Sequence, residues 1–387
     1  MIDTAKQVAV LGSTGSIGQS TLAVIAASDG HLRAAALSAH SRLDLLVQQA
    51  QQFQPDWVIA TDLAAAAGFD WSGLPKHTRV LLGQEGLEQT VRQPEIDIVL
   101  AAIVGSAGLR STWAAVDAGK NVALANKETL VMAGPLVMRL AAERGCKILP
   151  VDSEHSAVFQ ALQCGKGHEV QRIILTASGG PFRDYTAEQL EQVTLAEALQ
   201  HPTWDMGPKI TIDSATMMNK ALEIIEARWL FDLPPEKIDV VVHPQSIVHS
   251  LVEFVDGAML AQMSPPDMKL PIQYALYYPY RRPGISPRLD LTKRWELRFQ
   301  PPDLDRFPAL QLGLEAARQG GTAGAVLNAA NEAAVAAFRE GKLRFTEIAA
   351  ACRGILDHHN FESQPSLDQL DTLDRWARQE VSRWICA

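Results

Sequence analysis

A glycine-rich turn between a short apolar strand and a helix is the feature that most constrains how this chain folds. We expect the strand, the turn and the helix at residues 8–11, 12–18 and 20–27. Gly12 permits the tight turn, Gly15 lets a pyrophosphate approach the backbone, and Gly18 allows close packing of the helix. Unpaired N–H groups at the helix start can bind phosphate. The pattern predicts a dinucleotide site, with a purely structural turn as the alternative.

Further apolar strands alternate with helical patterns through the first 150 residues. They are expected at residues 33–37, 57–60, 96–103 and 122–125. This alternation favours a parallel sheet covered by helices, which supports the dinucleotide interpretation. The sequence therefore predicts an α/β fold with an N-terminal Rossmann-like domain.

The residues after the second expected strand indicate which dinucleotide binds. An NAD site usually has Asp or Glu about 20 residues past the glycines, and residues 36–42 (ALSAHSR) contain neither. Arg42, with Ser41 and His40, can instead contact a 2′-phosphate, which favours NADP. Ser41 can also cap a helix that begins near Leu43, and both roles are compatible.

Two carboxylates follow the apolar run at residues 146–150. In an extended strand Asp152 and Glu154 project from one face and Ser153 from the other. Close carboxylates repel unless a cation lies between them, so the pair suggests a divalent metal bound by oxygen ligands. A solvated strand end is the alternative.

A polar cluster follows the strand expected at residues 122–125. It consists of Asn126, Lys127 and Glu128. The carboxyl ends of strands in a doubly wound sheet face the ligand crevice, which makes Lys127 a candidate substrate contact. Alternatively, Asn126 and Glu128 cap the next helix.

Past residue 150 the pattern changes. A strand at residues 173–177 ends in a small-residue turn at residues 178–181, whose hydroxyl and N–H groups can hold an anion. Trp204 and Met206 lie in a loop at residues 201–208. Large apolar groups in such a loop often belong to a lid that excludes water, although Trp204 can equally pin the loop to the core.

A helix is expected to begin at Asp213 or Ser214, either of which can cap it. Asn219, Lys220 and Glu223 then share one face. The first two suit a phosphate near the helix start, and Glu223 can supply a third carboxylate to the metal. A solvated face with a Lys220–Glu223 ion pair is the alternative.

Composition argues against polyanionic and membrane partners. The chain has 387 residues and a formal net charge of −9 without a Lys/Arg-rich run, so nucleic acid is not an expected partner. No apolar run reaches about 18 residues, and no leader pattern precedes the first strand. The four scattered cysteines are typical of a reduced, cytoplasmic protein.

Four parts are expected along the chain. They are a dinucleotide-binding domain at residues 1–150, an α+β catalytic domain at 151–280, a proline-rich linker at 281–302 and a small helical domain at 303–387. The helical domain carries no constellation expected to be catalytic. His243 and His249 are expected to be structural, because His249 lies in a strand at residues 247–255 closed by a turn.

Six sequence blocks, taken in order, resemble the 1-deoxy-D-xylulose 5-phosphate reductoisomerase family. They are GSTGSIG, ANKE at residues 125–128, PVDSEHSA at 150–157, TASGGPF at 176–182, the run from 201 to 227, and LNAANE at 327–332. This resemblance covers nearly the whole chain. It implies conversion of deoxyxylulose phosphate to 2-C-methylerythritol 4-phosphate with NADPH and Mn²⁺ or Mg²⁺, on the non-mevalonate route to isoprenoids. It also implies a homodimer formed by the central domain, in which the strand at residues 247–255 could extend a sheet between subunits.

The family's functional residues carry over onto matching positions. The implied metal ligands are Asp152, Glu154 and Glu223, and the implied catalytic residues are these three with Lys127 and His201. The implied substrate contacts are Lys127, Ser153, Glu154, Ser178, His201, Trp204, Ser214, Asn219, Lys220 and Glu223. The implied cofactor contacts are Thr14, Gly15, Ser16, Ile17, Asn126, Glu128, Met206 and Gly207, beside Gly12, Ser41 and Arg42 expected from the patterns above. A substrate contact at Ser153 implies a backbone that departs from a flat strand. The chain itself departs from the family at residues 40–42, where many members have Gly-Lys-Asn or a similar run, so the contacts to the 2′-phosphate stay open.

Two other functions would use the same dinucleotide-binding domain. A metal-free NADP-dependent aldehyde or semialdehyde dehydrogenase would normally need a reactive Cys, or a Lys or His acid, in place of three carboxylates. A non-catalytic nucleotide sensor would bind NADPH without turnover and use the helical tail as a partner surface. The preferred metal, the kinetic constants, the order of rearrangement steps and the oligomeric state are not determined by the sequence.

Overall fold

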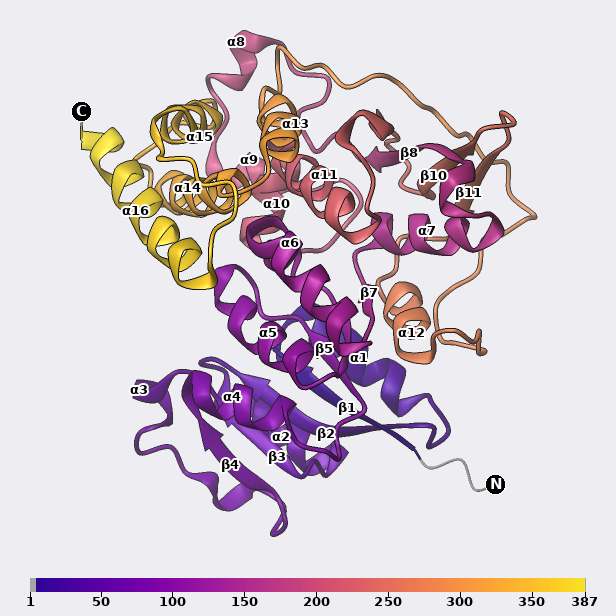
Figure 1. Cartoon of the computed structure of the whole chain (residues 1–387), viewed down its shortest axis with the longest axis vertical. Coiled ribbons are helices and arrows are strands. Elements are labelled where there is room, and N and C mark those ends of the chain that lie inside the picture. Colours follow the sequence, from indigo (N-terminus) through magenta and orange to yellow (C-terminus); the bar gives the residue numbers. More distant parts are fainter. Residues whose placement is uncertain (1–4, 387) are drawn as a thin grey trace. The chain divides into compact units, whose positions relative to one another are not determined.

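The alternating strands and helices of the N-terminal region form a seven-stranded parallel sheet in the computed structural model, which describes residues 5–386 (Figure 1). The strand order is β4-β3-β2-β1-β5-β6-β7. The strands are β1 (Lys6–Leu11), β2 (Leu32–Ala39), β3 (Trp57–Ala60), β4 (Arg79–Leu82), β5 (Ile98–Ala101), β6 (Asn121–Leu124) and β7 (Ile148–Pro150). The order reverses between β1 and β5, so their carboxyl ends flank the crevice where doubly wound sheets bind ligands.

Helices connect these strands as the sequence predicts. They are α1 (Ser16–Ala26), α2 (Leu43–Phe53), α3 (Leu63–Ala66), α4 (Gly83–Val91) and α5 (Leu109–Asp117). The central strands are almost wholly inaccessible, because helices cover both faces of a doubly wound sheet, and this explains their continuous apolar runs. The predicted Rossmann-like fold is confirmed, with the ends of the expected strands within about two residues of their predicted positions. Strand β4 was not expected, because its residues are half-exposed and form no buried apolar run.

The chain divides into two compact units. The first contains residues up to 129, together with 136–156 and 267–287, so it includes α12 (Lys269–Tyr277). The second contains residues 130–135, 157–266 and those from 288 onward. The chain passes from one unit to the other within α6 (Lys127–Arg144) and α7 (Ser153–Ala161). The division at residues 150, 280 and 302 stays a prediction.

A four-stranded mixed sheet lies in the second unit, in the order β11-β10-β8-β9. Its strands are β8 (Val170–Ala177), β9 (Ile238–Val242), β10 (Val248–Phe254) and β11 (Met259–Met263). Strand β10 pairs with β8 on one side and β11 on the other. The expectation that this strand extends a sheet between subunits is therefore wrong, because an internal strand has no free edge.

Helices complete the second unit. They are α8 (Ala187–Leu190), α9 (Leu195–Ala198), α10 (Pro208–Ala215), α11 (Met218–Leu230), α13 (Ala309–Gln319), α14 (Ala323–Arg339), α15 (Glu347–His358) and α16 (Leu367–Cys386). Helix α11 is central to the hydrophobic core, where Leu222 and Ile225 are buried with Val326 of α14. A Cβ on Gly313 of α13 would lie 2.5 Å from the Cα of Ala221, so only glycine permits this close helix packing. The predicted C-terminal helical region is confirmed.

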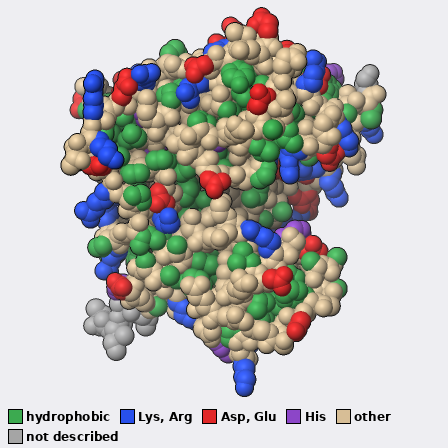
Figure 2. Space-filling model, turned by 180° about the vertical axis from the view of Figure 1, so that it is seen from behind, with side chains coloured by type: hydrophobic (Ala, Val, Ile, Leu, Met, Phe, Trp, Pro, Cys, Tyr) green, Lys and Arg blue, Asp and Glu red, His purple; other side chains and the backbone are tan. Residues whose placement is uncertain are grey.

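The surface carries both signs of charge. On the face drawn in Figure 2, Lys and Arg side chains are interspersed with Asp and Glu. None of the helices within residues 5–386 combines the length and apolarity needed to cross a membrane.

Candidate active site

The glycine turn after β1 has the close contacts that its sequence predicts. Gly12 has a φ of +82°, and a Cβ there would lie 2.7 Å from the carbonyl oxygen of Ala102, beyond β5. Gly15 is the N-cap of α1 and provides no side-chain hydrogen bond, so the first N–H groups of the helix stay available to an anion. Ser16 is exposed and Ile17 half-buried at this helix start. The turn therefore has the geometry of a pyrophosphate site.

Two buried side chains hold the turn in place. Ser38 of β2 accepts a 2.8 Å hydrogen bond from the backbone N–H of Gly12. Gln49 of α2 accepts one from the Ser13 hydroxyl at 2.7 Å and donates one to the Ser13 carbonyl at 3.0 Å. The sequence motif did not identify these supports. The only sequence signal was a Gln on the apolar face of an amphipathic helix.

Arg42 lies beside the same turn. Its guanidinium group donates a hydrogen bond to the carbonyl oxygen of Thr14. Arg42 is itself the N-cap of α2, and no side chain caps this helix, so the alternative cap by Ser41 does not form. Ser41 and Arg42 are both exposed. A cation next to the dinucleotide turn is the arrangement that a 2′-phosphate requires.

Asn126 caps α6 and also binds the loop that follows β5. Its Oδ1 accepts a 3.0 Å bond from the N–H of Thr129, and its Nδ2 donates to the carbonyls of Ile103 and Gly105 at 2.7 and 3.0 Å. The Nδ2 group also donates to the buried Glu128 at 2.9 Å. The capping alternative is thus right for Asn126, and it places this residue at the carboxyl edge of the sheet.

The backbone around the carboxylate pair is helical where an extended strand was expected. Strand β7 ends at Pro150, and the carbonyl of Asp152 accepts the first bond of α7 from Ser156 at 2.8 Å. Asp152 and Glu154 therefore stand at a helix start, and the expected alternation of strand faces is wrong. The implied departure from a flat strand at Ser153 is confirmed, and its hydroxyl donates to Glu154 at 2.6 Å.

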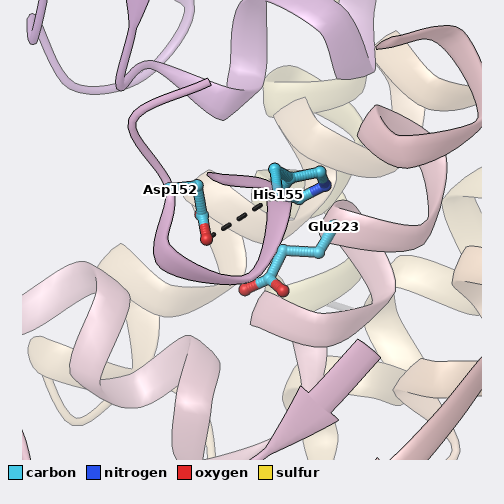
Figure 3. A group of neighbouring side chains, drawn as sticks. All are labelled: Asp152, His155 and Glu223. Carbon is cyan, nitrogen blue, oxygen red and sulfur yellow. Dashed lines mark ion pairs between the residues drawn. The ribbon is translucent and has the colours of Figure 1, made fainter. Parts of the chain in front are cut away.

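Asp152 forms a buried charge cluster with two neighbours in the first unit. Lys127 Nζ lies 2.9 Å from its carboxylate, and His155 Nδ1 lies 3.6 Å away. Figure 3 draws the pair of Asp152 and His155. Burial by itself would raise the pKa of Asp152, but the charge of Lys127 and the contact with His155 hold it well below its ordinary value. The carboxylate is therefore ionised at neutral pH and suited to bind a cation.

Two serines and a histidine converge in the second unit. His201 Nε2 lies 2.9 Å from the Ser178 hydroxyl and 3.1 Å from the Ser214 hydroxyl. His201 Nδ1 accepts backbone N–H bonds from Thr203 and Trp204 at 3.1 and 2.9 Å. Burial lowers the pKa of His201 to about 4, so the ring is neutral near pH 7. Because Nδ1 is an acceptor, the ring proton is on Nε2 and points to the serines.

The predicted helix at residue 213 consists of two helices. Helix α10 begins at Pro208 with Gly207 as its N-cap, and Met217, at a φ of 62°, separates it from α11. Neither Asp213 nor Ser214 is an N-cap, and that expectation is wrong. The left-handed residue Met217 lies between the two helices. No sign of this break is visible in the sequence, because neither a glycine nor a proline stands there.

The first turns of α11 carry a buried polar group. Lys220 donates to the Glu223 carboxylate, and Asn219 Nδ2 donates to its other oxygen at 2.5 Å. The Lys220–Glu223 ion pair of the alternative interpretation exists, but it is not solvated, since the two side chains are 3% and 1% exposed. Burying an ion pair costs more than most surface pairs contribute, so such a pair indicates a functional role.

The segment between α9 and α10 is a loop, as predicted. Trp204 is half-buried with its ring centroid 6.2 Å from that of His249, while Met206 is half-buried and Gly207 exposed. His249 Nε2 contacts the carbonyl of Ser264 at 3.1 Å, and His243 Nδ1 contacts that of Arg298 at 2.8 Å. These bonds to backbone give both histidines the structural role that the sequence indicates.

A doubly wound sheet with an arginine beside its dinucleotide turn, together with full-length relatives solved in complex with NADPH, assigns the chain to the NADP-dependent oxidoreductases. Models described as 1-deoxy-D-xylulose 5-phosphate reductoisomerase and as its C-terminal domains match residues 8–134, 148–231 and 263–380. The chain belongs to the 1-deoxy-D-xylulose 5-phosphate reductoisomerase family.

Relatives of that name are similar along nearly their whole length. The protein from Heliobacterium modesticaldum is 52% identical over 97% of this chain and 96% of its own, and that from Rhodopirellula baltica is 49% identical over 96% and 93%. A solved reductoisomerase in complex with NADPH, fosmidomycin and magnesium is 43% identical, with a TM-score of 0.92 over 98% of both chains. The Zymomonas mobilis enzyme in complex with NADPH is 42% identical, with a TM-score of 0.91 over 98% of this chain and 99% of its own.

Proposed function

We propose that this protein converts 1-deoxy-D-xylulose 5-phosphate to 2-C-methyl-D-erythritol 4-phosphate with NADPH and a divalent cation, in non-mevalonate isoprenoid synthesis. Full-length relatives share the reductoisomerase name, and solved relatives bind NADPH and magnesium. The structural observation that carries the proposal is the convergence of Ser178, His201 and Ser214. This neutral, hydrogen-bonding cluster suits the phosphate of a sugar phosphate.

The phosphate subsite is proposed to combine this cluster with the start of α11. The hydroxyls of Ser178 and Ser214 and the Nε2–H of His201 donate to phosphate oxygens, and Asn219 and Lys220 supply an amide and a charge. His201 contributes as a neutral donor, because burial lowers its pKa to about 4. Its backbone bonds to the loop couple phosphate binding to the position of Trp204, so loop closure can exclude water once substrate is bound.

The donor set fits a hard divalent cation. Asp152 stays ionised beside Lys127, and Glu154 and Glu223 add two more carboxylates, which are the ligands that Mg²⁺ and Mn²⁺ prefer. We propose that these three residues hold the cation. When bound, the cation polarises the carbonyl and the adjacent hydroxyl of the substrate, and NADPH supplies the hydride that reduces the rearranged aldehyde.

The chain's own groups then position and shield the reactants. Lys127, 2.9 Å from Asp152, keeps that carboxylate ionised and presents an ammonium group to a substrate oxygen. The glycine turn and Arg42 orient the dinucleotide, with Asn126 and Glu128 at the neighbouring strand end. Ser153, at the first position of α7, places its hydroxyl beside Glu154 for the substrate.

The cysteines do not favour the metal-free dehydrogenase. Burial raises the pKa of the Cys146 and Cys352 thiols, which keeps them protonated and unreactive. Cys164 and Cys386 are exposed, and all four cysteines are free thiols, which agrees with the cytoplasmic location that the sequence predicts. A catalytic thiolate would instead need a basic or helix-terminal environment that lowers its pKa.

One absorbance assay separates the three functions. NADPH oxidation is followed at 340 nm with deoxyxylulose phosphate and Mn²⁺, before and after treatment with EDTA. We expect turnover that EDTA abolishes and added Mn²⁺ restores. Full activity after EDTA treatment would support the metal-free dehydrogenase, and NADPH binding without turnover would support a nucleotide sensor.

We further infer a homodimer that pairs through β11. This strand is at the edge of the four-stranded sheet, with Met259 and Leu260 exposed at 49% and 37%. An open edge with exposed apolar side chains favours pairing with a second copy. Light scattering coupled to size exclusion should give twice the chain mass for the wild type and a smaller mass for Leu260→Lys.

A further inference from the structure

Asp213, immediately before Ser214, is a buried carboxylate with partners on α10 and α14 of the second unit. Its side chain is 1% exposed, and Lys209, one turn earlier on α10, places Nζ 2.7 Å from Oδ2. Asn331 of α14 donates its Nδ2–H to Oδ1 at 2.9 Å. Burial raises the pKa of Cys352 on α15, and the nearby negative charge of Asp213 adds to this effect.

The contact with Asn331 connects distant parts of the chain. It joins residues 118 positions apart, and Asn331 is itself 0% exposed. A buried carboxylate is stable only with charged and hydrogen-bonding partners, and Lys209 and Asn331 provide one of each. The C-terminal helices, which carry no catalytic constellation in the sequence, thus reach the segment that contains the proposed phosphate ligands.

Asp213 is also directly connected to the proposed phosphate ligands. Ser214 follows it directly and places its hydroxyl 3.1 Å from His201 Nε2. The carbonyl of Asp213 accepts a 3.2 Å bond from the Thr216 hydroxyl, which in turn accepts the N–H of Met218, the first residue of α11. The same hydroxyl also contacts the carbonyl of Ile212 at 3.1 Å, so the backbone at residues 212–213 links the end of α10 to the start of α11.

We propose that Asn331 is a positioning residue for phosphate binding, which acts by holding Asp213 and, through it, Ser214 and the start of α11. The inference rests on the proposed function and deepens it, because it gives the C-terminal helical region a part in substrate recognition. Without Asn331, the carboxylate loses a hydrogen bond and turns toward Lys209 alone, and Ser214 leaves its place beside His201.

Asn328 offers a matched control on the same helix. It is also 0% exposed, and within residues 5–386 the Oδ1 atoms of Asn328 and Asn331 both have no hydrogen-bond partner. Asn328 differs in its donor contact, which is a 3.0 Å bond to Glu332, a residue paired with Arg378 of α16. Replacement of either Asn by Ala removes one buried amide and one charge-assisted bond, but only Asn331 is connected to the phosphate ligands.

The test compares Asn331→Ala, Asn328→Ala and Ser214→Ala in the full-length protein. The measurements are the KM for deoxyxylulose phosphate, the affinity for inorganic phosphate by calorimetry, the Kd for NADPH and the unfolding temperature. We expect Asn331→Ala to weaken both substrate and phosphate binding about tenfold, as lost bonds to charged groups do, with NADPH binding unchanged. Asn328→Ala should lower the unfolding temperature by about as much as Asn331→Ala does, because each loses one buried amide, but it should leave phosphate binding unchanged.

An exchange of the two side chains tests the hydrogen bond directly. Asn331→Asp alone places two carboxylates together and should abolish phosphate binding, whereas Asp213→Asn with Asn331→Asp restores one donor and one carboxylate and should recover most of it. This pair also serves if Asn331→Ala fails to fold. Equal phosphate affinities for Asn331→Ala and Asn328→Ala, or no recovery of phosphate binding in the exchange, would overturn the role of Asn331 but leave the proposed phosphate subsite intact. Unchanged phosphate affinity in Ser214→Ala would instead contradict the proposed phosphate subsite, and the inference with it.

Discussion

Gly18→Ala tests whether the glycine turn needs the close packing that the structure shows. A Cβ at position 18 would lie 2.3 Å from the carbonyl oxygen of Gly12 and 2.5 Å from the Cα of Ser13. Since Cβ contacts under 3.0 Å essentially do not occur, the turn must move by at least 3.0 − 2.3 = 0.7 Å. Both contacted atoms are backbone, so no side-chain rotation relieves the overlap.

The magnitude follows from the cost of overpacking. Insertion of a methyl group into a filled site costs about 1–3 kcal/mol. For a unit of this size each kcal/mol lowers the unfolding temperature by about 2–4 °C, so we expect a decrease of about 2–12 °C. The displaced N–H groups should also bind the pyrophosphate less well. Each 1.4 kcal/mol of binding free energy lost raises the Kd for NADPH about tenfold.

Two other glycines provide controls. Gly15→Ala places its Cβ 3.3 Å from the Gly12 carbonyl, a contact that small shifts relieve, so the unfolding temperature should stay near that of the wild type while NADPH binding weakens. Gly167→Ala meets no atom within 4 Å and should change neither quantity. Differential scanning fluorimetry and NADPH fluorescence titration give both values. A Gly18→Ala variant with the stability and NADPH affinity of Gly167→Ala would refute the reasoning.

Three further predictions concern charge. Glu223→Gln should reduce metal-dependent turnover far more than NADPH binding, and equal loss of both in kinetics and titration would contradict the proposed metal site. Arg42→Ala should weaken NADPH binding about tenfold without changing NADH binding, while Arg42→Lys should keep part of the preference for NADPH. Equal losses of affinity for NADPH and NADH would exclude a contact with the 2′-phosphate. Because burial lowers the pKa of His201 to about 4 in the folded state, the unfolded chain takes up this proton first. The contribution of neutral His201 to folding stability is therefore complete above about pH 6.5 and is lost as the pH falls toward 4. His201→Gln lacks this proton uptake, so its unfolding temperature should fall less than that of the wild type between pH 7.5 and 4.5.

The sequence predicted the first sheet well because its signals are local. The expected strands are short apolar runs, mostly buried, that alternate with helical patterns, so their type follows without knowledge of distant residues. Strand β4 was missed because its residues are only half-buried and form no such run. The chemistry of the candidate site was also visible in sequence, since carboxylates, hydroxyls and a lysine occur in compact motifs. The structure places Arg42 beside the turn, and its contact with the cofactor stays a prediction.

Local backbone geometry was less predictable. The helix start at Ser153 was missed although Asp152 and Glu154 are typical of a helix start, because the two carboxylates also fit the alternation of a strand. The left-handed residue Met217 has no glycine or asparagine to mark it. The free edge at β11 was also missed, since strand order in a mixed sheet depends on pairings between residues far apart in sequence.

The sequence by itself determined the parallel dinucleotide fold, the preference for NADP and the kinds of groups at the candidate site, since all three depend on neighbouring residues. Only the tertiary structure decided which charges are buried and which partners hold them. Lys220 and Glu223 are an ordinary surface pair by spacing, and their burial comes from the helices packed around α11. Asn331 reaches Asp213 only because α14 packs against α10, and no sequence pattern specifies a hydrogen bond across that distance.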